Sequence, residues 1–155
     1  MYLQNYLNNL NSDKIVLYVD MDGVIVDYDV GNPTDYDKKR PLYSSIAKLE
    51  EISKMPNVEL FILSVCRMSK GIEEKNIWLD RYASFFKKEN RIILDREGND
   101  FKHSKELKLE YIKREKNNTN TVVLIDDDVQ ILDEIKRNVK NIILLKDTAL
   151  VDWYL

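Results

Sequence analysis

The chain has 155 residues, of which 44% are hydrophobic and 33% are charged, and its formal net charge is −3. This length and composition predict one globular domain, residues 1–155, that can bury a core without disulfides or a structural metal. The net charge argues against a general polyanion binder but allows a local basic groove. Cys66 is the only cysteine, which excludes an intrachain disulfide.

The sequence shows no signal for a membrane. No apolar run approaches the roughly 18 residues that a membrane-spanning helix needs. Residues 1–11 lack the basic start and the apolar centre of a signal peptide. We therefore expect a cytoplasmic protein without a membrane partner.

Short apolar runs alternate with helical patterns along the chain. In chain order we expect a strand at Ile15–Val19, a helix near 42–55, a strand at Leu60–Leu63, a helix near 72–86, a strand at Arg91–Leu94, a helix near 104–116, a strand at Val122–Ile125, a helix near 129–139 and a strand at Ile142–Leu145. The strands are continuously apolar, which is typical of parallel strands covered on both faces. The alternation predicts an α/β fold with a doubly wound parallel sheet of about five strands. Ligands of such sheets bind beyond the carboxyl ends of the strands.

Acidic residues follow two of these predicted strands. The first strand continues into Asp20, Asp22 and Gly23, and the fourth continues into Asp126–Asp128. Carboxylates that converge at one sheet edge repel one another, so their ionised forms need a cation or a raised pKa. Hard oxygen ligands suit Mg²⁺. The alternative, that acidic residues simply end strands in solvated turns, is weaker for two such clusters than for one aspartate.

These segments resemble the motifs of the haloacid-dehalogenase (HAD) phosphatases. Tyr18–Val24 is similar to the first HAD motif, Asp-x-Asp-Gly after an apolar strand. Phe61–Ser64 resembles the second motif, a strand that ends in Ser or Thr, and Leu124–Asp128 resembles the fourth. The motifs occur in order, each after a predicted strand, and extend over residues 15–145.

The resemblance implies a role for each acidic residue. Asp20 would be the nucleophile that forms an aspartyl-phosphate, and Asp22 would be the general acid and base. Mg²⁺ would be held by Asp20, the backbone carbonyl of Asp22 and Asp126. Asp127 would be a second ligand or would orient a bound water. Asp128 is better interpreted as a helix N-cap.

Further residues would contact the substrate. In the resemblance Ser64 donates a hydrogen bond to a phosphoryl oxygen, although a serine can also merely end a strand. Gly23 would let the chain turn over the phosphate. Arg67 could contact the substrate, or it could be an exposed arginine near a helix start.

The third HAD motif is a lysine, for which Lys102, Lys105 and Lys108 are candidates. Lys108–Ile112 resembles the lysine-bearing helix in the phosphatase domain of phage polynucleotide kinase. We place Lys108 first and Lys105 second. A solvated helix face is the alternative for each of them.

Two substrates are compatible with these resemblances. Glu74–Leu79 and Leu124–Asp127 resemble the 5′(3′)-deoxyribonucleotidases, which act on nucleoside monophosphates. The helix around Lys108 resembles polynucleotide 3′-phosphatases, whose substrate is a nucleic-acid end. The intervals between motifs are too short for a large cap domain, so the enzyme is expected to be capless or to carry a minimal cap. We prefer a nucleotidase-like enzyme that acts on a small phosphorylated substrate, with end processing as the alternative.

A different class of function also fits the scaffold. The chain could be a non-catalytic regulatory module that binds a phosphorylated ligand, since fold alone does not fix function. Both Asp20 and Asp22 are present, and this favours the enzyme.

Overall fold

The computed structural model describes residues 2–28, 31 and 35–152. Five strands form one parallel sheet in the order β3-β2-β1-β4-β5. Their bounds are β1 Ile15–Val19, β2 Val58–Cys66, β3 Arg91–Asp95, β4 Thr121–Asp126 and β5 Ile142–Lys146. The predicted α/β fold with a doubly wound parallel sheet is confirmed.

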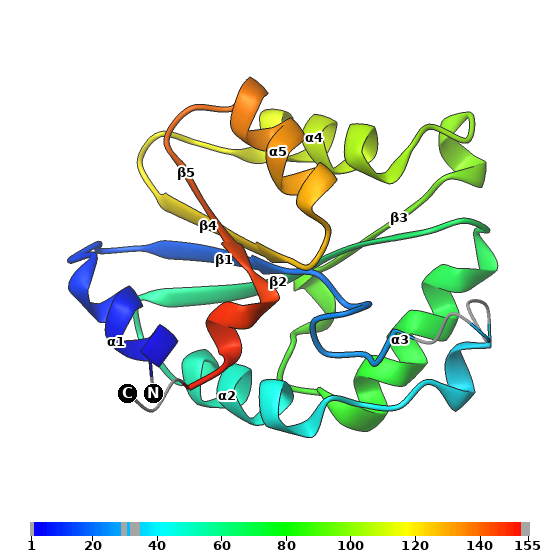
Figure 1. Ribbon diagram of the computed structural model, residues 1–155, viewed down its shortest axis with the longest axis horizontal. Helices are drawn as coiled ribbons and strands as arrows, with labels where there is room; N and C mark the ends of the chain where they lie inside the picture. Colours follow the sequence, from blue (N-terminus) through cyan, green and yellow to red (C-terminus); the bar gives the residue numbers. More distant parts are fainter. Residues whose placement is uncertain (1, 29–30, 32–34, 153–155) are drawn as a thin grey trace.

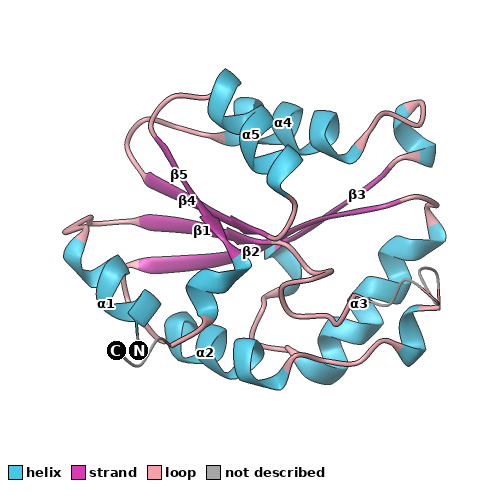
Figure 2. Cartoon of the chain, viewed as in Figure 1, coloured by secondary structure: helices cyan, strands magenta, loops and turns pink. Residues whose placement is uncertain are grey.

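Helices cover both faces of this sheet (Figures 1 and 2). They are α1 Tyr2–Asn9, α2 Tyr43–Ser53, α3 Lys70–Tyr82, α4 Ser104–Glu115 and α5 Val129–Asn138. Helices α4 and α5 lie on one face, and α1, α2 and α3 lie on the other (Figure 1). None of the helices formed by the described residues has the length and apolar character that crossing a bilayer requires.

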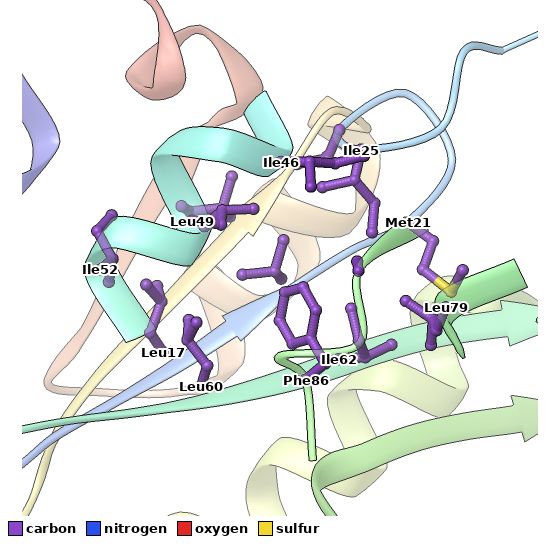
Figure 3. Packing of buried hydrophobic residues seen from close by; sticks show 14 of the residues in the cluster. Leu17, Met21, Ile25, Ile46, Leu49, Ile52, Leu60, Ile62, Leu79 and Phe86 are labelled. Atoms are coloured by element: carbon purple, nitrogen blue, oxygen red, sulfur yellow. The ribbon is translucent and has the colours of Figure 1, made fainter. Parts of the chain in front are cut away.

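Strand β1 is buried along its whole length because it lies at the centre of the sheet. Its side chains alternate between the faces, so Leu17 packs on the side of α1–α3 and Tyr18 packs on the side of α4 and α5. Figure 3 shows the first of these cores, in which Leu17, Leu60 and Ile62 of the sheet meet Leu49 of α2 and Phe86. This double burial explains why the sequence of β1 reads as an uninterrupted apolar run.

The elements differ from expectation mainly at their ends. Strand β2 continues to Cys66 because it pairs with β3 as far as Asp95, so Ser64 lies inside the strand and does not end it. Helix α1 was not predicted. Asp128 is the N-cap of α5, as expected, and its side chain accepts a hydrogen bond from the backbone of Gln130. The N-cap of α4 is His103, one residue before the expected Ser104.

Candidate functional site

Three carboxylates meet where β1 and β4 end. Strands β1 and β4 are neighbours, with Val19 opposite Ile125, so Asp20 and Asp126 end adjacent strands at the same edge. One oxygen each from Asp20, Asp126 and Asp127 lies within 4.8 Å of the others. Asp126 is fully buried and Asp20 nearly so. The predicted cluster of acidic residues therefore exists.

Lys108 lies between two of these carboxylates. Its ammonium donates to Asp20 Oδ1 at 3.0 Å and to Asp126 Oδ2 at 2.6 Å, and its side chain is only 2% exposed. Burial alone would lower the pKa of Lys108, but Asp20 and Asp126 raise it above its ordinary value. The lysine therefore stays charged and is held in place by both acids. Of the three candidate lysines, Lys108 is the one that contacts the carboxylates.

One lysine does not balance three carboxylates. Burial and the neighbouring Asp126 raise the pKa of Asp20 to about 8, against the opposing effect of Lys108. The same two causes raise the pKa of Asp127 to about 6. The pKa values are raised first because burial disfavours the ionised forms and then because neighbouring carboxylates repel one another, and a nearby positive charge would oppose both effects. A hard divalent cation bound by these oxygens would supply that charge.

Gly23 lets Asp127 approach the loop after β1. Its φ is +83°, and a Cβ there would lie 1.9 Å from Asp127 Oδ2. The loop is a tight turn, in which the backbone N–H groups of Val24, Ile25 and Val26 all point to the Met21 carbonyl. A side chain at position 23 would displace Asp127.

Asp22 has surroundings of the opposite charge. It accepts hydrogen bonds from Lys39 at 3.0 Å, from Lys75 at 3.1 Å and from the Tyr36 hydroxyl at 2.9 Å. Both lysine side chains are almost fully buried. Burial would raise the pKa of Asp22, but Lys75 and Lys39 lower it below its ordinary value. In this structure Asp22 is therefore an ionised carboxylate.

Ser64 is tied to Lys75 at the same place. Lys75 donates to Ser64 Oγ at 2.6 Å and to the Val65 carbonyl at 3.0 Å, in addition to its bond to Asp22. Because Ser64 accepts this bond, its own hydroxyl proton remains available for donation. Ser64 is fully buried, so in this arrangement it positions Lys75. Its predicted contact with a phosphoryl oxygen stays a prediction.

Lys75, Lys39 and Tyr36 were not among the residues chosen from the sequence. Lys75 precedes Trp78 by three residues and Leu79 by four, and both of those are buried. A lysine on the apolar face of a helix is a signal that could have identified it. Lys39 follows a short 3-10 helix, Tyr36–Lys38, and carries no comparable pattern.

Two adjoining pockets open at this edge of the sheet. The reaction pocket, of about 350 Å³, is lined by Asp20, Asp22, Lys108 and the acidic residues after β4. The side pocket, of about 380 Å³, is lined by Asp22, Arg67 and Lys75. A larger hollow of about 1080 Å³ lies beside α2 and the residues before the chain end. It lies apart from the three converging carboxylates, so chemistry and not size identifies the candidate site.

The two other residues predicted to bind substrate lie on opposite sides of the reaction pocket. Arg67 lines the side pocket. Lys105 lines a third pocket, of about 300 Å³, which shares Ser104, Asp128 and Ile131 with the reaction pocket. Neither side chain contacts the three carboxylates.

Comparison with known proteins supports the fold. The sequence matches no protein-family model and no curated protein. The structure resembles one described as the Pnkp1/Rnl/Hen1 complex, with a TM-score of 0.67 and 19% identity over 88% of this chain and 46% of that one. A structure of the Pnkp1/Rnl/Hen1 RNA repair complex gives a TM-score of 0.66 and 19% identity, over 86% and 42% of the two chains. The chain thus spans less than half the length of these two chains, and it shares with them an α/β fold.

Proposed function

We propose that this chain is a magnesium-dependent phosphomonoester hydrolase of the HAD type, with Asp20 as its nucleophile. The observation that carries the proposal is the group of Asp20, Asp126 and Asp127, of which the first two are buried and contact Lys108. Such a group can hold both a divalent cation and a phosphate, provided that the cation separates their negative charges. The second aspartate, Asp22, lines the same pocket.

The residues present fit Mg²⁺. Asp20, Asp126 and Asp127 offer hard oxygens. Burial and the neighbouring Asp126 raise the pKa values of Asp20 and Asp127, and a bound cation would stabilise their ionised forms. When bound, the ion would neutralise the repulsion between the carboxylates and the phosphate. Lys108 would keep the attacking carboxylate of Asp20 oriented through its bond to Oδ1.

The reaction has two steps. A carboxylate oxygen of Asp20 attacks phosphorus, the bond between phosphorus and the ester oxygen breaks, and that oxygen receives a proton from Asp22. Water then attacks the phosphorus of the aspartyl-phosphate. Asp22 accepts a proton from this water, and the bond between Asp20 and phosphorus breaks to release inorganic phosphate.

Asp22 must carry a proton for the first step, whereas Lys75 and Lys39 lower its pKa in this structure. A phosphate dianion beside Lys75 would compete with Asp22 for that lysine. It would also place negative charge near Asp22 and raise its affinity for a proton. We therefore expect substrate binding itself to prepare Asp22 as an acid.

A polynucleotide end is the substrate that we favour. The structures that resemble this chain belong to an RNA repair complex. Trp78, part of the segment that resembles the nucleotidases, is buried and donates its indole N–H to the Lys39 carbonyl, so it packs in the core and does not face a ligand. Lys75 of the same segment does reach the site, which keeps a nucleoside monophosphate as the second candidate.

Phosphate release from a substrate panel tests the proposal. The panel holds an aryl phosphate, the nucleoside monophosphates and a 3′-phosphorylated oligonucleotide, each with and without Mg²⁺. We expect Mg²⁺-dependent release that Asp20→Asn lowers by about 10⁴-fold or more, because the nucleophile is lost. Asp13→Asn, at an exposed aspartate, is the matched control. Turnover of the Asp20→Asn protein near the wild-type rate, or no release from any substrate, would contradict the proposal.

A further inference from the structure

Asp22 forms part of the boundary between two pockets. Of the residues that line the reaction pocket and the side pocket, Asp22 and Val65 belong to both. Of these two pockets, Asp20 and Lys108 line the reaction pocket alone, and Arg67 and Lys70 line the side pocket alone. A molecule that passes Asp22 therefore leaves the carboxylate cluster and enters a space with different chemistry.

The proposed reaction predicts on which side of Asp22 the leaving group lies. In phosphoryl transfer the attacking oxygen and the leaving oxygen are roughly in line, on opposite sides of phosphorus. Asp20 provides the attacking oxygen, and Asp22 must be near the leaving oxygen to give it a proton. A leaving alcohol that extends past Asp22, away from Asp20, would enter the side pocket.

Two cationic side chains in the side pocket are not paired with any described residue. Arg67 and Lys70 are exposed, and their side chains form no hydrogen bond or ion pair with any described residue. Lys75, in contrast, is occupied by Asp22 and Ser64. Glu74 is the acidic residue besides Asp22 on this wall. Since Asp22 is already paired with two lysines, Arg67 and Lys70 exceed Glu74 in the side pocket by one positive charge. Lys70 and Glu74 also border a small hollow with Asp35 and Asp37.

The same wall offers an apolar surface. Met68 lies between the two cations in sequence, lines the side pocket and is 41% exposed. A thioether is polarizable and adapts to the face of an aromatic ring. Two free cations beside a soft apolar side chain match a nucleotide, whose phosphate is anionic and whose base is a flat ring.

We propose that the side pocket binds the polynucleotide strand on the leaving-group side of the terminal phosphate, with Arg67 and Lys70 contacting the next phosphate of its backbone. This inference rests on the proposed function. A nucleoside monophosphate has no such second phosphate, so the two cations distinguish a strand end from a free nucleotide. The alternative is that the strand extends in the other direction, into the pocket that is lined by Lys105.

Kinetics of three variants test the inference. The double variant Arg67→Ala/Lys70→Ala is compared with Lys105→Ala, on a 3′-phosphorylated oligonucleotide and on an aryl phosphate. Lys136→Ala/Lys140→Ala removes two exposed cations from the end of α5 and the segment that leads into β5, and is the control for net charge. We expect Arg67→Ala/Lys70→Ala to lower kcat/KM for the oligonucleotide about tenfold more than for the aryl phosphate, because the variant cannot hold the backbone phosphate.

Equilibrium binding separates this inference from the proposed function. Affinity for the 3′-phosphorylated oligonucleotide is measured in the Asp20→Asn background, with and without Arg67→Ala/Lys70→Ala, at several salt concentrations. We expect weaker binding and a salt slope that is smaller by about 0.7 for each backbone phosphate that the variant no longer neutralises. Wild-type protein that releases phosphate from no substrate would overturn the proposed function, while the binding result would still decide the inference.

Three results would overturn the inference. The first is an equal loss of activity on the oligonucleotide and on the aryl phosphate in Arg67→Ala/Lys70→Ala. The second is oligonucleotide binding that this variant leaves unchanged. The third is a selective loss in Lys105→Ala, which would place the strand on the opposite side of the carboxylates.

Discussion

Asp20 and Asp22 are separated by one residue, yet their surroundings have opposite charge. Asp20 lies beside Asp126 and Asp127 and contacts one lysine, so burial and Asp126 raise its pKa. Asp22 contacts two lysines and a tyrosine hydroxyl, and Lys75 and Lys39 lower its pKa. The two halves of one site are therefore electrostatically distinct.

This difference bears on the catalytic roles proposed for Asp20 and Asp22. Paired carboxylates whose pKa values are pushed apart commonly take different roles in catalysis. Here the order without ligands is the reverse of the proposed roles, so a cation at Asp20 and an anion near Asp22 would have to invert it. The half around Asp20 lacks positive charge and would be completed by a cation. The half around Asp22 already contains two lysines, Lys75 and Lys39. A bound anion would compete with Asp22 for these lysines.

The origin of the difference lies in which elements face each residue. Asp20 ends β1 beside β4, and the end of β4 contributes acidic residues. Asp22 lies in the following turn and faces α3, which contributes Lys75, and the segment that contributes Tyr36 and Lys39. One residue of chain between the two aspartates is enough to place them against different elements.

The largest effect is expected from the half around Asp20. Lys108→Met removes the lysine between Asp20 and Asp126, and we expect kcat to fall by roughly 10²–10³-fold, as for removal of a preorganised electrostatic interaction. We also expect a loss of about 3 kcal/mol in the free energy of unfolding, because two buried carboxylates are left unpaired. Steady-state kinetics and urea denaturation measure both effects.

The destabilisation in Lys108→Met should depend on pH. Without the lysine the folded-state pKa of Asp20 rises further above its unfolded value, so stability is lost as pH rises. Because the pKa of Asp20 is already about 8 with the lysine present, the further loss should appear above that pH. It should be larger at pH 9 than at pH 6, where the carboxyl keeps its proton in both proteins. Lys105→Met is the matched control on the same helix. An equal fall in kcat in both variants would remove Lys108 from the proposed machinery.

A smaller effect is expected from the half around Asp22. Lys75→Met leaves Asp22 with one lysine, Lys39, beside the Tyr36 hydroxyl, and removes the hydrogen bond to Ser64. We expect kcat/KM to fall by roughly 10–100-fold, because a positive charge near the leaving oxygen is removed. Kinetics on the aryl phosphate measure this change, with the exposed Lys140→Met as control. A variant as active as that control would show that the lysines around Asp22 do not support the reaction.

The smallest effect is expected at the turn that joins the two halves. The new Cβ in Gly23→Ala would clash with Asp127 at a positive φ, so we expect half-maximal activity to need about tenfold more Mg²⁺, as for loss of a ligand's orientation. Magnesium titration of activity measures the shift. Gly98→Ala would bring a Cβ to 2.7 Å from Asp95 Oδ2, away from the three carboxylates. It is the control, and an equal magnesium shift in both would contradict the role given to Gly23.

The sequence alone was sufficient to predict the sheet and the acidic half of the site. Continuous apolar runs identified the five strands because strands buried on both faces leave no polar alternation. Neighbouring parallel strands end at the same edge, so the acidic residues at the ends of β1 and β4 were expected to meet. The structure confirms that these two strands are neighbours. The resemblance of Lys108–Ile112 to the lysine-bearing helix of a phage phosphatase domain selected a lysine that the structure brings to Asp20 and Asp126.

The surroundings of Asp22, in contrast, depend on tertiary packing. Lys75, Lys39 and Tyr36 reach Asp22 from α3 and from a loop far along the chain, and their positions depend on how α3 packs beside the sheet. The same packing places Ser64 inside β2, against Lys75 and not at a strand end. A motif specifies which residues follow a strand, but contacts between distant elements depend on packing. For this reason the lysines and the tyrosine around Asp22 could be identified only from the structure.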